Sequence, residues 1–266
     1  APTAYHEFRT DPYAGQLGAA VDLGDQGQGL LVWDVPLMPE EFCAQSGAIC
    51  LRVLAHALLS ADELQQWQEM KAPLRRKREW LFGRAAVKEA VRHWVHAATG
   101  ELPYATEVEV LVEPGGSLRV AGWWSESLVA APRVSLTHNA ASCVAAVAAP
   151  DTPVGVDLEA HGRLKDPAAV AQQFAPSEQD WMAGLQGEAL HERVLRLWSA
   201  KEAAAKCLGQ GLQGDPSAFV VVGADEGLCR LDVAHGAVQV GVELVARPNG
   251  VLALATMNQW DVEAIE

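Results

Sequence analysis

The chain has 266 residues, of which 50% are hydrophobic and 20% are charged, a composition typical of folded soluble proteins. This length allows one large domain or two small ones with a buried core. No apolar run reaches the roughly 18 residues that a membrane-spanning helix needs, and the first residues lack the basic and apolar stretches of a secretory signal. The five cysteines form no Cys-x-x-Cys pair, which favours reduced thiols over disulfides or a zinc site. We therefore expect a cytoplasmic protein without a membrane partner.

The charge distribution indicates one local anion site. The formal net charge of −14 argues against a nucleic-acid partner, because such proteins need a positive surface. Eight of the 20 Lys and Arg residues nevertheless fall within residues 71–92. A basic patch on an acidic protein predicts a small polyanionic ligand or an acidic partner that docks at one place, and a solvated helix face is the alternative.

The first half of the chain predicts helices packed on antiparallel strands. Residues 1–28 show no clear period and are interpreted as a leader or linker. Ser60 and Glu63 have the spacing of a helix-capping box. The other elements expected before residue 140 are a strand at 30–37, helical structure within 39–58, an amphipathic helix at 76–98, a hairpin of strands at 106–112 and 117–120, and a strand at 133–137.

The second half repeats this order of elements. Its expected elements are strands at 142–149 and 154–158, helices at 167–174, 177–184 and 188–208, and strands at 218–223, 228–233, 237–245 and 250–257. Lys88-Glu89-Ala90 on the first long helix is echoed by Lys201-Glu202-Ala203 on the second. We therefore predict an α+β fold of two halves, residues 29–140 and 141–266, each with one long helix on a mostly antiparallel sheet. A cleft between two such halves is a natural ligand site.

Two short segments supply three carboxylates of special interest. Asp157 and Glu159 are two residues apart on a predicted strand, so they project from the same face. Glu202 and Lys206 are four residues apart on a predicted helix and also share a face. Each pair alone has a simpler explanation than a ligand site. The strand pair can lie on a solvated strand edge, and the helix pair can be an exposed ion pair. The apolar neighbours of the strand pair favour burial, and buried carboxylates need a counter-charge, so together the segments suit a hard cation that carries a phosphate.

The strand at 133–137 leads into a second group of polar residues. Thr137 and His138 lie at its end, where a hydroxyl and an imidazole can hold an anion, although a lone histidine is often structural. The sequence contains no Gly-x-x-x-x-Gly-Lys-[Ser/Thr] or Gly-x-Ser-x-Gly pattern, and its single Gly-x-Gly-x-x-Gly run, at residues 209–214, follows a predicted helix and not the strand that a dinucleotide site requires. Dinucleotide, P-loop and hydrolase-elbow sites therefore lack support.

These motifs resemble the Sfp-type 4′-phosphopantetheinyl transferases. The specific part of the resemblance is the pair of segments 155–159 (Gly-Val-Asp-Leu-Glu) and 198–206 (Trp-Ser-Ala-Lys-Glu-Ala-Ala-Ala-Lys), and the segments 78–84 and 136–139 support it in order. The family fold is a pseudo-dimer of two similar α+β halves with the ligand between them. Its members move the phosphopantetheine arm of coenzyme A onto a serine of an acyl or peptidyl carrier protein and release 3′,5′-ADP.

The resemblance also implies a role for each matching residue. Asp157, Glu159 and Glu202 would hold Mg²⁺, and Glu202 would also act as the base for the serine hydroxyl, with Lys206 as its catalytic partner. The expected contacts to coenzyme A are Lys206 and Lys201 at the phosphates, Thr137 and His138 at the 3′-phosphate, and Arg78 and Arg84 near the nucleotide. The turn at 114–117 lacks the lysine that the family often places there. A pseudo-dimer is expected to work as a monomer.

Other interpretations remain open at this point. One is a Mg²⁺-dependent hydrolase of nucleotides or coenzyme A, which would pass the group to water. Another is a non-catalytic module that binds coenzyme A or a carrier protein, although such a module has no need of the three carboxylates and Lys206. The first 28 residues lie outside the resemblance. From them we expect the chain to be a domain excised from a polyketide or fatty acid synthase.

Overall fold

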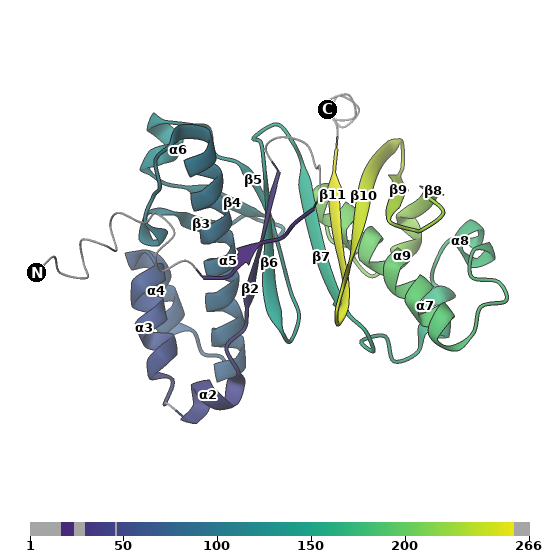
Figure 1. The fold of residues 1–266 in the computed structure, drawn as a ribbon, viewed down its shortest axis with the longest axis horizontal. Helices are drawn as coiled ribbons and strands as arrows, with labels where there is room; N and C mark the ends of the chain where they lie inside the picture. The colour runs from purple at the N-terminus through teal and green to yellow at the C-terminus, as the bar shows by residue number, and fades with distance from the viewer. Residues whose placement is uncertain (1–16, 24–29, 46, 258–266) are drawn as a thin grey trace, which may run out of the picture.

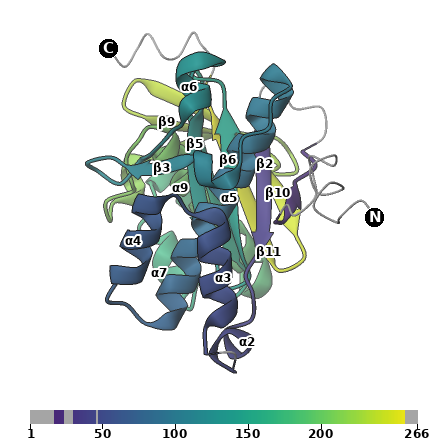
Figure 2. The same ribbon diagram turned by 90° about the vertical axis from the view of Figure 1, so that its left-hand side faces the viewer.

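A computed structural model describes residues 17–23, 30–45 and 47–257 of the chain. Two antiparallel sheets lie against each other in the middle of the molecule, and one long helix covers the outer face of each (Figure 1). Seen from the side, α3, α4 and α5 cover the first sheet (Figure 2). The predicted α+β class, with one long helix on the antiparallel sheet of each half, is confirmed.

The first sheet has the strand order β1-β2-β6-β5-β4-β3. Its half contains β1 (Ala19–Ala20), β2 (Leu31–Pro36), α2 (Glu40–Gln45), α3 (Ile49–Leu58), α4 (Ala61–Glu69), α5 (Leu74–Thr99), the 3-10 turn η1 (Ala105–Glu107), β3 (Glu109–Val112), β4 (Leu118–Ala121), α6 (Trp123–Ser127), β5 (Arg133–His138) and β6 (Ser142–Ala148).

The second sheet has the order β7-β11-β10-β9-β8. Its half contains β7 (Val154–Ala160), α7 (Pro167–Ala171), α8 (Pro176–Asp180), α9 (Gly187–Cys207), the 3-10 turn η2 (Pro216–Ala218), β8 (Val220–Ala224), β9 (Arg230–His235), β10 (Val238–Arg247) and β11 (Gly250–Thr256).

The sequence pattern predicts most of these elements. Ser60 and Glu63 form the expected capping box at the start of α4, and Gly100, at a φ of 80°, ends α5, as glycine does at many helix C-termini. The short helix α6 was not predicted, and β3 begins at Glu109 because a 3-10 turn precedes it. Although α5 has 26 residues, it carries many charges, and no helix among the described residues is both long and apolar enough to cross a membrane.

Two predictions concern the division of the chain. The predicted boundary between residues 140 and 141 separates β5 from β6, yet these strands are neighbours in the first sheet. The two sheets instead divide at the turn between Ala148 and Val154. Within the predicted leader of residues 1–28, Ala19 and Ala20 pair with β2, so this part lies on the body of the fold. The leader residues 1–16 and 24–28 lie outside the described residues.

Each half is organised around a buried lysine on its long helix. In the first half, Lys88 on α5 is fully buried, and its Nζ lies 2.6 Å from Glu63 Oε2. The same ammonium donates to the carbonyl oxygens of Ala105 and Val108 around η1. Glu63 accepts in addition from the N–H of Val110 on β3. We call this arrangement, in which one lysine joins a helix start, a 3-10 turn and an outer strand, the lysine clamp.

The second half repeats the clamp. Lys201 on α9 is fully buried, and its Nζ lies 2.6 Å from Glu178 Oε2. It donates to the carbonyl oxygens of Pro216 and Phe219 around η2, and Glu178 accepts from the N–H of Val221 on β8. The same contacts recur at matching positions, so the pseudo-dimer suggested by the repeated Lys-Glu-Ala is present in three dimensions.

A third core joins the two halves. It lies between the sheet faces that the long helices leave open, and residues of β2 and β6 pack there against residues of β7 and β11. An ion pair between Arg247 and Asp34 closes this interface at one side. The buried residues of this core are Val32, Val144, Ala146, Ala148, Val154, Val156, Leu158, Leu252 and Leu254.

Candidate active site

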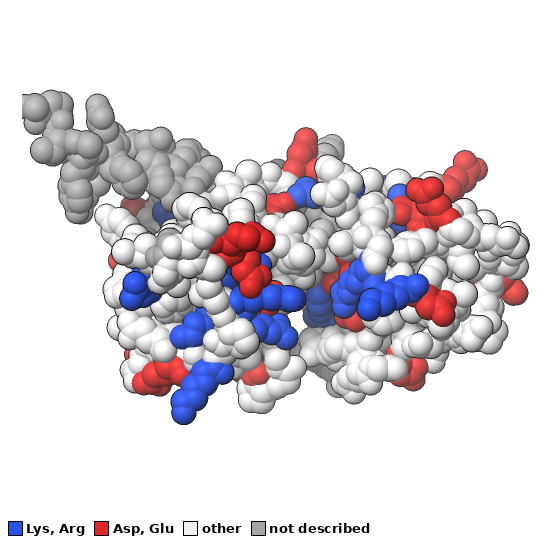
Figure 3. Space-filling model, turned by 90° about the horizontal axis from the view of Figure 1, so that it is seen from below, with Lys and Arg blue, Asp and Glu red and all other residues white. Residues whose placement is uncertain are grey.

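The predicted site residues meet in a cleft of about 690 Å³ where the two halves join. Its walls come from the start of α5, the end of β5, the end of β7 and the second half of α9. On the face seen from below, Lys and Arg side chains gather near the hollow between the halves (Figure 3), although the protein as a whole is acidic. The lining residues are Arg75, Glu79, Leu136, Thr137, His138, Asn139, Ala140, Asp157, Glu159, Ala160, Arg163, Glu202 and Lys206.

Strand alternation and one glycine bring the carboxylates to this cleft. Val154, Val156 and Leu158 point into the core between the sheets, so the alternate residues of β7 face α9. Gly155 lies against α9 so closely that a Cβ there would come within 2.0 Å of the Ala203 carbonyl oxygen. The glycine therefore permits the close approach of strand and helix that places Glu202 and Lys206 beside the end of β7.

The two strand carboxylates are buried and only partly paired. Asp157 is 5% exposed and Glu159 is 2% exposed. Lys206 Nζ lies 2.9 Å from Asp157 Oδ1 and also donates to the carbonyl oxygen of Val156. Arg163, from the loop after β7, forms an ion pair with Glu159 through Oε1. Asp157 Oδ2 and Glu159 Oε2 are buried without a hydrogen-bond partner.

The crowding of negative charge changes the protonation of the glutamates. Burial raises the pKa of Glu159, and the charges of Asp157 and Glu202 raise it further, whereas Arg163 opposes this. Burial also raises the pKa of Glu202, together with the charge of Asp157, against the opposing charges of Lys206 and Arg163. Two basic side chains thus offset three carboxylates incompletely.

The donor set fits a hard divalent cation. Mg²⁺ prefers carboxylate oxygens, and two buried oxygens of this cluster have no partner. In the described part of the chain, however, no three His, Cys, Asp or Glu side chains stand together as ready metal ligands. Arg163 occupies Glu159 instead, so its side chain supplies positive charge at the place where a cation would be needed.

The cleft also contains a histidine next to a charged network. His138 Nε2 lies 3.9 Å from Glu79 Oε2, and Glu79 is paired with Arg75 and Arg76. Burial lowers the pKa of His138, and the charges of Arg76, Lys206 and Arg75 lower it further, while Glu79 opposes them. The imidazole is therefore held toward its neutral form, in which one ring nitrogen can still donate a hydrogen bond.

Three predicted ligand contacts lie outside the cleft, and these expectations are corrected. Lys201 is enclosed in the lysine clamp of the second half. Arg84 is buried against Glu63 of the other clamp, and Arg78 is buried and donates to the carbonyl oxygen of Met38. All three belong to long helices with several basic residues. Packing decides which face of each helix turns toward the cleft, and the sequence alone does not show that face.

The structure adds residues that the sequence did not single out. Arg75, Glu79 and Asn139 line the cleft, as does Arg163. The basic stretch 71–92 contains the signal for Arg75, but the resemblance drew attention to its neighbour Arg78 instead. Arg163 lies in a loop, where no periodicity marks it.

The first half contains a closed counterpart of this site. When Lys88 is aligned with Lys201, Glu89 corresponds to Glu202 and His93 to Lys206. Trp33 on β2 stacks on the His93 ring at a centroid distance of 4.2 Å, in the place where β7 offers a carboxylate to α9. An aromatic stack thus fills the first position, and the acidic cluster belongs to the second half.

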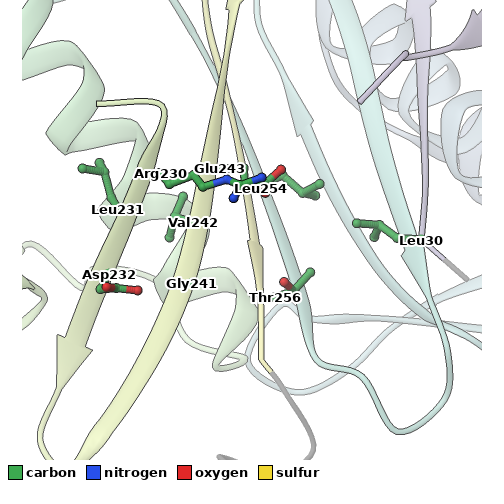
Figure 4. A pocket seen from close by; sticks show the side chains of 9 residues that line it. All are labelled: Leu30, Arg230, Leu231, Asp232, Gly241, Val242, Glu243, Leu254 and Thr256. Carbon is green, nitrogen blue, oxygen red and sulfur yellow. Dashed lines mark ion pairs between the residues drawn. The ribbon is translucent and has the colours of Figure 1, made fainter. Parts of the chain in front are cut away.

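A smaller hollow of about 250 Å³ lies on the second sheet. It is lined by Arg230, Asp232, Glu243 and other residues of β9, β10 and β11, and by Leu30 of the first half (Figure 4). Arg230 and Glu243 form an ion pair there at 3.3 Å. Their charges neutralise each other at an exposed surface, so the hollow lacks the buried, unpaired oxygens of the cleft.

One of the comparisons with known proteins concerns a stretch of chain that forms part of this cleft. The fold and cleft define a two-half α+β protein whose cleft brings three carboxylates together with Lys206. The model of the 4′-phosphopantetheinyl transferase superfamily matches residues 153–249, which include β7 and α9. The resemblance found in the motifs is thereby confirmed at the level of this superfamily. No curated protein matches the chain.

Two solved structures resemble parts of the chain. A holo-(acyl-carrier-protein) synthase from Bacillus anthracis str. Ames, in complex with CoA (3′,5′-ADP), is 19% identical and matches with a TM-score of 0.34 over 39% of this chain and 93% of that chain. Thermotoga maritima holo-[acyl-carrier-protein] synthase is 21% identical and matches with a TM-score of 0.32 over 48% of this chain and 67% of that chain. Both likenesses are partial.

Proposed function

We propose that the chain transfers the 4′-phosphopantetheine group of coenzyme A to a serine of an acyl or peptidyl carrier protein and releases 3′,5′-ADP. The observation that carries this proposal is the meeting of Asp157, Glu159, Glu202 and Lys206 in one cleft, within the stretch that matches the superfamily. Because both walls of the cleft come from one chain, we assign the protein to the Sfp type and expect the monomer to suffice. Its place of work would be the cytoplasm.

We further propose that the cleft works with Mg²⁺. Asp157, Glu159 and Glu202 would hold the ion. Arg163 would release Glu159 when the ion binds. When bound, the ion supplies positive charge that reduces the repulsion between the phosphates and an incoming nucleophile. Lys206 adds a second positive charge at the same place, and attack on a phosphate depends mainly on such charge and on positioning.

Glu202 is the residue best suited to take the serine proton. Its carboxylate lies in the cleft on the same helix face as Lys206, where a positioned carboxylate can act as a general base. In the proposed step the serine oxygen forms a bond to the β-phosphorus of coenzyme A, the bond from that phosphorus to the 3′,5′-ADP oxygen breaks, and the serine proton passes to Glu202. Lys206 lies beside the carboxylates and would stabilise the charge on the leaving phosphate.

The test is transfer to an apo carrier protein with coenzyme A and Mg²⁺, followed by intact-mass spectrometry. We expect one added phosphopantetheine per carrier serine with the native protein and none with Glu202→Gln. Glu188→Gln, an exposed glutamate on the same helix α9, is the matched control and should be as active as the native protein. Free phosphopantetheine without carrier modification would instead identify a hydrolase, and no turnover with any apo carrier would overturn the proposal.

A further inference from the structure

The outer edge of β7 is closed by two hydroxyl groups from the other half. One edge of this strand pairs with β11, and the other faces β5. The N–H of Val156 donates to Ser135 Oγ at 3.1 Å, and the N–H of Leu158 donates to Thr137 Oγ1 at 3.2 Å. The two hydroxyl-bearing residues are two positions apart on β5, and the two N–H groups are two positions apart on β7. The two strands therefore match in register although they belong to different sheets.

The two hydroxyls differ in one respect. Thr137 Oγ1 also lies 3.5 Å from Asp157 Oδ1, the oxygen that accepts from Lys206 at 2.9 Å. In the part of the chain that the structure describes, Ser135 makes no such hydrogen bond to a carboxylate. Asp157 Oδ2 has no partner. Lys206 and Thr137 therefore approach Asp157 through one oxygen and leave the other available.

We propose that Thr137 is a positioning residue that holds Asp157 in place from the opposite half, and that it does not bind the 3′-phosphate. This inference rests on the proposed function for its cation. Thr137 is 6% exposed, and its hydroxyl accepts one hydrogen bond from the backbone and directs its own proton toward Asp157. A hydroxyl has one proton to donate, so a Thr137 hydroxyl that donates to Asp157 has no second proton for a hydrogen bond to a phosphate. His138, the next residue on the strand, is 44% exposed at its side chain and remains available to the ligand.

The position of Thr137 gives the cation site a dependence on the docking of the halves. A carboxylate that is oriented by an outer hydrogen bond binds metal more tightly, and loss of such a bond typically costs about 10-fold or more in affinity. Since the bond comes from β5 and the carboxylate from β7, the cation would bind well only when both halves are in register.

The test compares Thr137→Val, Thr137→Ser and Ser135→Ala. Binding of Mn²⁺ to the protein without coenzyme A is followed by electron paramagnetic resonance, and stability by urea unfolding. Thr137→Val should weaken Mn²⁺ binding by about 10-fold, and Thr137→Ser should restore it. Ser135→Ala removes a matching bond to β7 and should lower the urea midpoint similarly while Mn²⁺ binding stays as in the native protein.

Several outcomes would overturn the inference. Equal loss of Mn²⁺ binding in Thr137→Val and Ser135→Ala would show a merely structural role, and a native protein that binds no Mn²⁺ would remove the basis of the proposal. Thr137→Val that weakens binding of coenzyme A but not of 3′-dephospho-coenzyme A would assign Thr137 to the 3′-phosphate instead. If Thr137→Val does not fold, Thr137→Cys takes its place. A native protein that binds Mn²⁺ with the expected pattern but modifies no carrier would refute only the proposed function.

Discussion

Replacement of Lys201 by methionine tests the division of labour on helix α9. Lys201 Nζ is fully buried with Glu178, which is itself fully buried, and it also donates to the carbonyl oxygens of Pro216 and Phe219. Methionine has a similar length but no charge and no donor. Lys201→Met therefore leaves a buried carboxylate without its cation and two carbonyl groups without their donor.

The expected loss of stability is large. Removal of one partner from a buried ion pair costs about 3–5 kcal/mol, and each orphaned carbonyl group would cost about 1–3 kcal/mol taken alone. These contributions overlap, because the protein can relax or Glu178 can take up a proton, so we expect about 3–5 kcal/mol in total. A domain of this size is stable by about 5–15 kcal/mol, and the variant should stay folded with a melting temperature lower by roughly 10 °C.

The assay pairs urea unfolding with binding of coenzyme A and uses Lys206→Met as the matched variant. Lys206 is partly exposed and lies in the cleft, so Lys206→Met should cost less stability than Lys201→Met, although it leaves Asp157 without its cation, and it should lose transfer activity. Lys201→Met should show the opposite pattern, and Lys88→Met, in the clamp of the first half, should resemble it. A Lys201→Met protein as stable as the native one but with weakened coenzyme A binding would refute the clamp and restore Lys201 as a phosphate ligand.

Three further predictions concern other parts of the fold. Burial lowers the pKa of His93 to about 4, so below the ordinary value of 6.5 the unfolded chain binds a proton that the native state does not. The free energy of unfolding should therefore fall by up to about 3 kcal/mol as the pH falls from 6.5 to about 4. His93→Phe, which keeps the stack on Trp33, should reduce this loss in urea unfolding, and an unchanged pH profile would contradict the prediction. Arg163→Ala removes the cation that competes for Glu159, so Mn²⁺ titration should show severalfold tighter binding, and weaker binding would mean that Arg163 helps to hold the ion. Gly155→Ala forces a Cβ against the backbone of α9, which should cost about 1–3 kcal/mol or more and abolish Mn²⁺ binding; native-like unfolding and Mn²⁺ binding together would contradict the close approach.

Much of the fold is readable from local patterns. The capping box at Ser60, the apolar stripe of the helix at 74–99 and the alternation within β7 all depend on residues close together in the sequence, and periodicity reports such features directly. The order of elements likewise predicts two similar halves. The predicted boundary after residue 140 falls between β5 and β6, which are joined by a short turn after His138, and only strand pairing shows that β6 belongs to the first sheet.

The site divides in the same way. Asp157 and Glu159 are brought together by strand alternation, and Glu202 and Lys206 by helical spacing, so the sequence identified all four. Lys201 precedes Lys206 by five residues, which turns its side chain about 140° away around the helix. The sequence shows that separation but not which of the two lysines faces the cleft.

The sequence by itself determined the helix and strand pattern, the two acidic segments and the superfamily to which their motifs point. The tertiary structure decided which basic residues reach the carboxylates: Arg163 and Lys206 do, whereas Lys201 is held by Glu178 in the clamp. It also places the Thr137 hydroxyl against the N–H of Leu158 on β7. The physical reason is that these contacts join residues far apart in the chain, and the burial and charge that select among them exist only once the sheets and helices have packed.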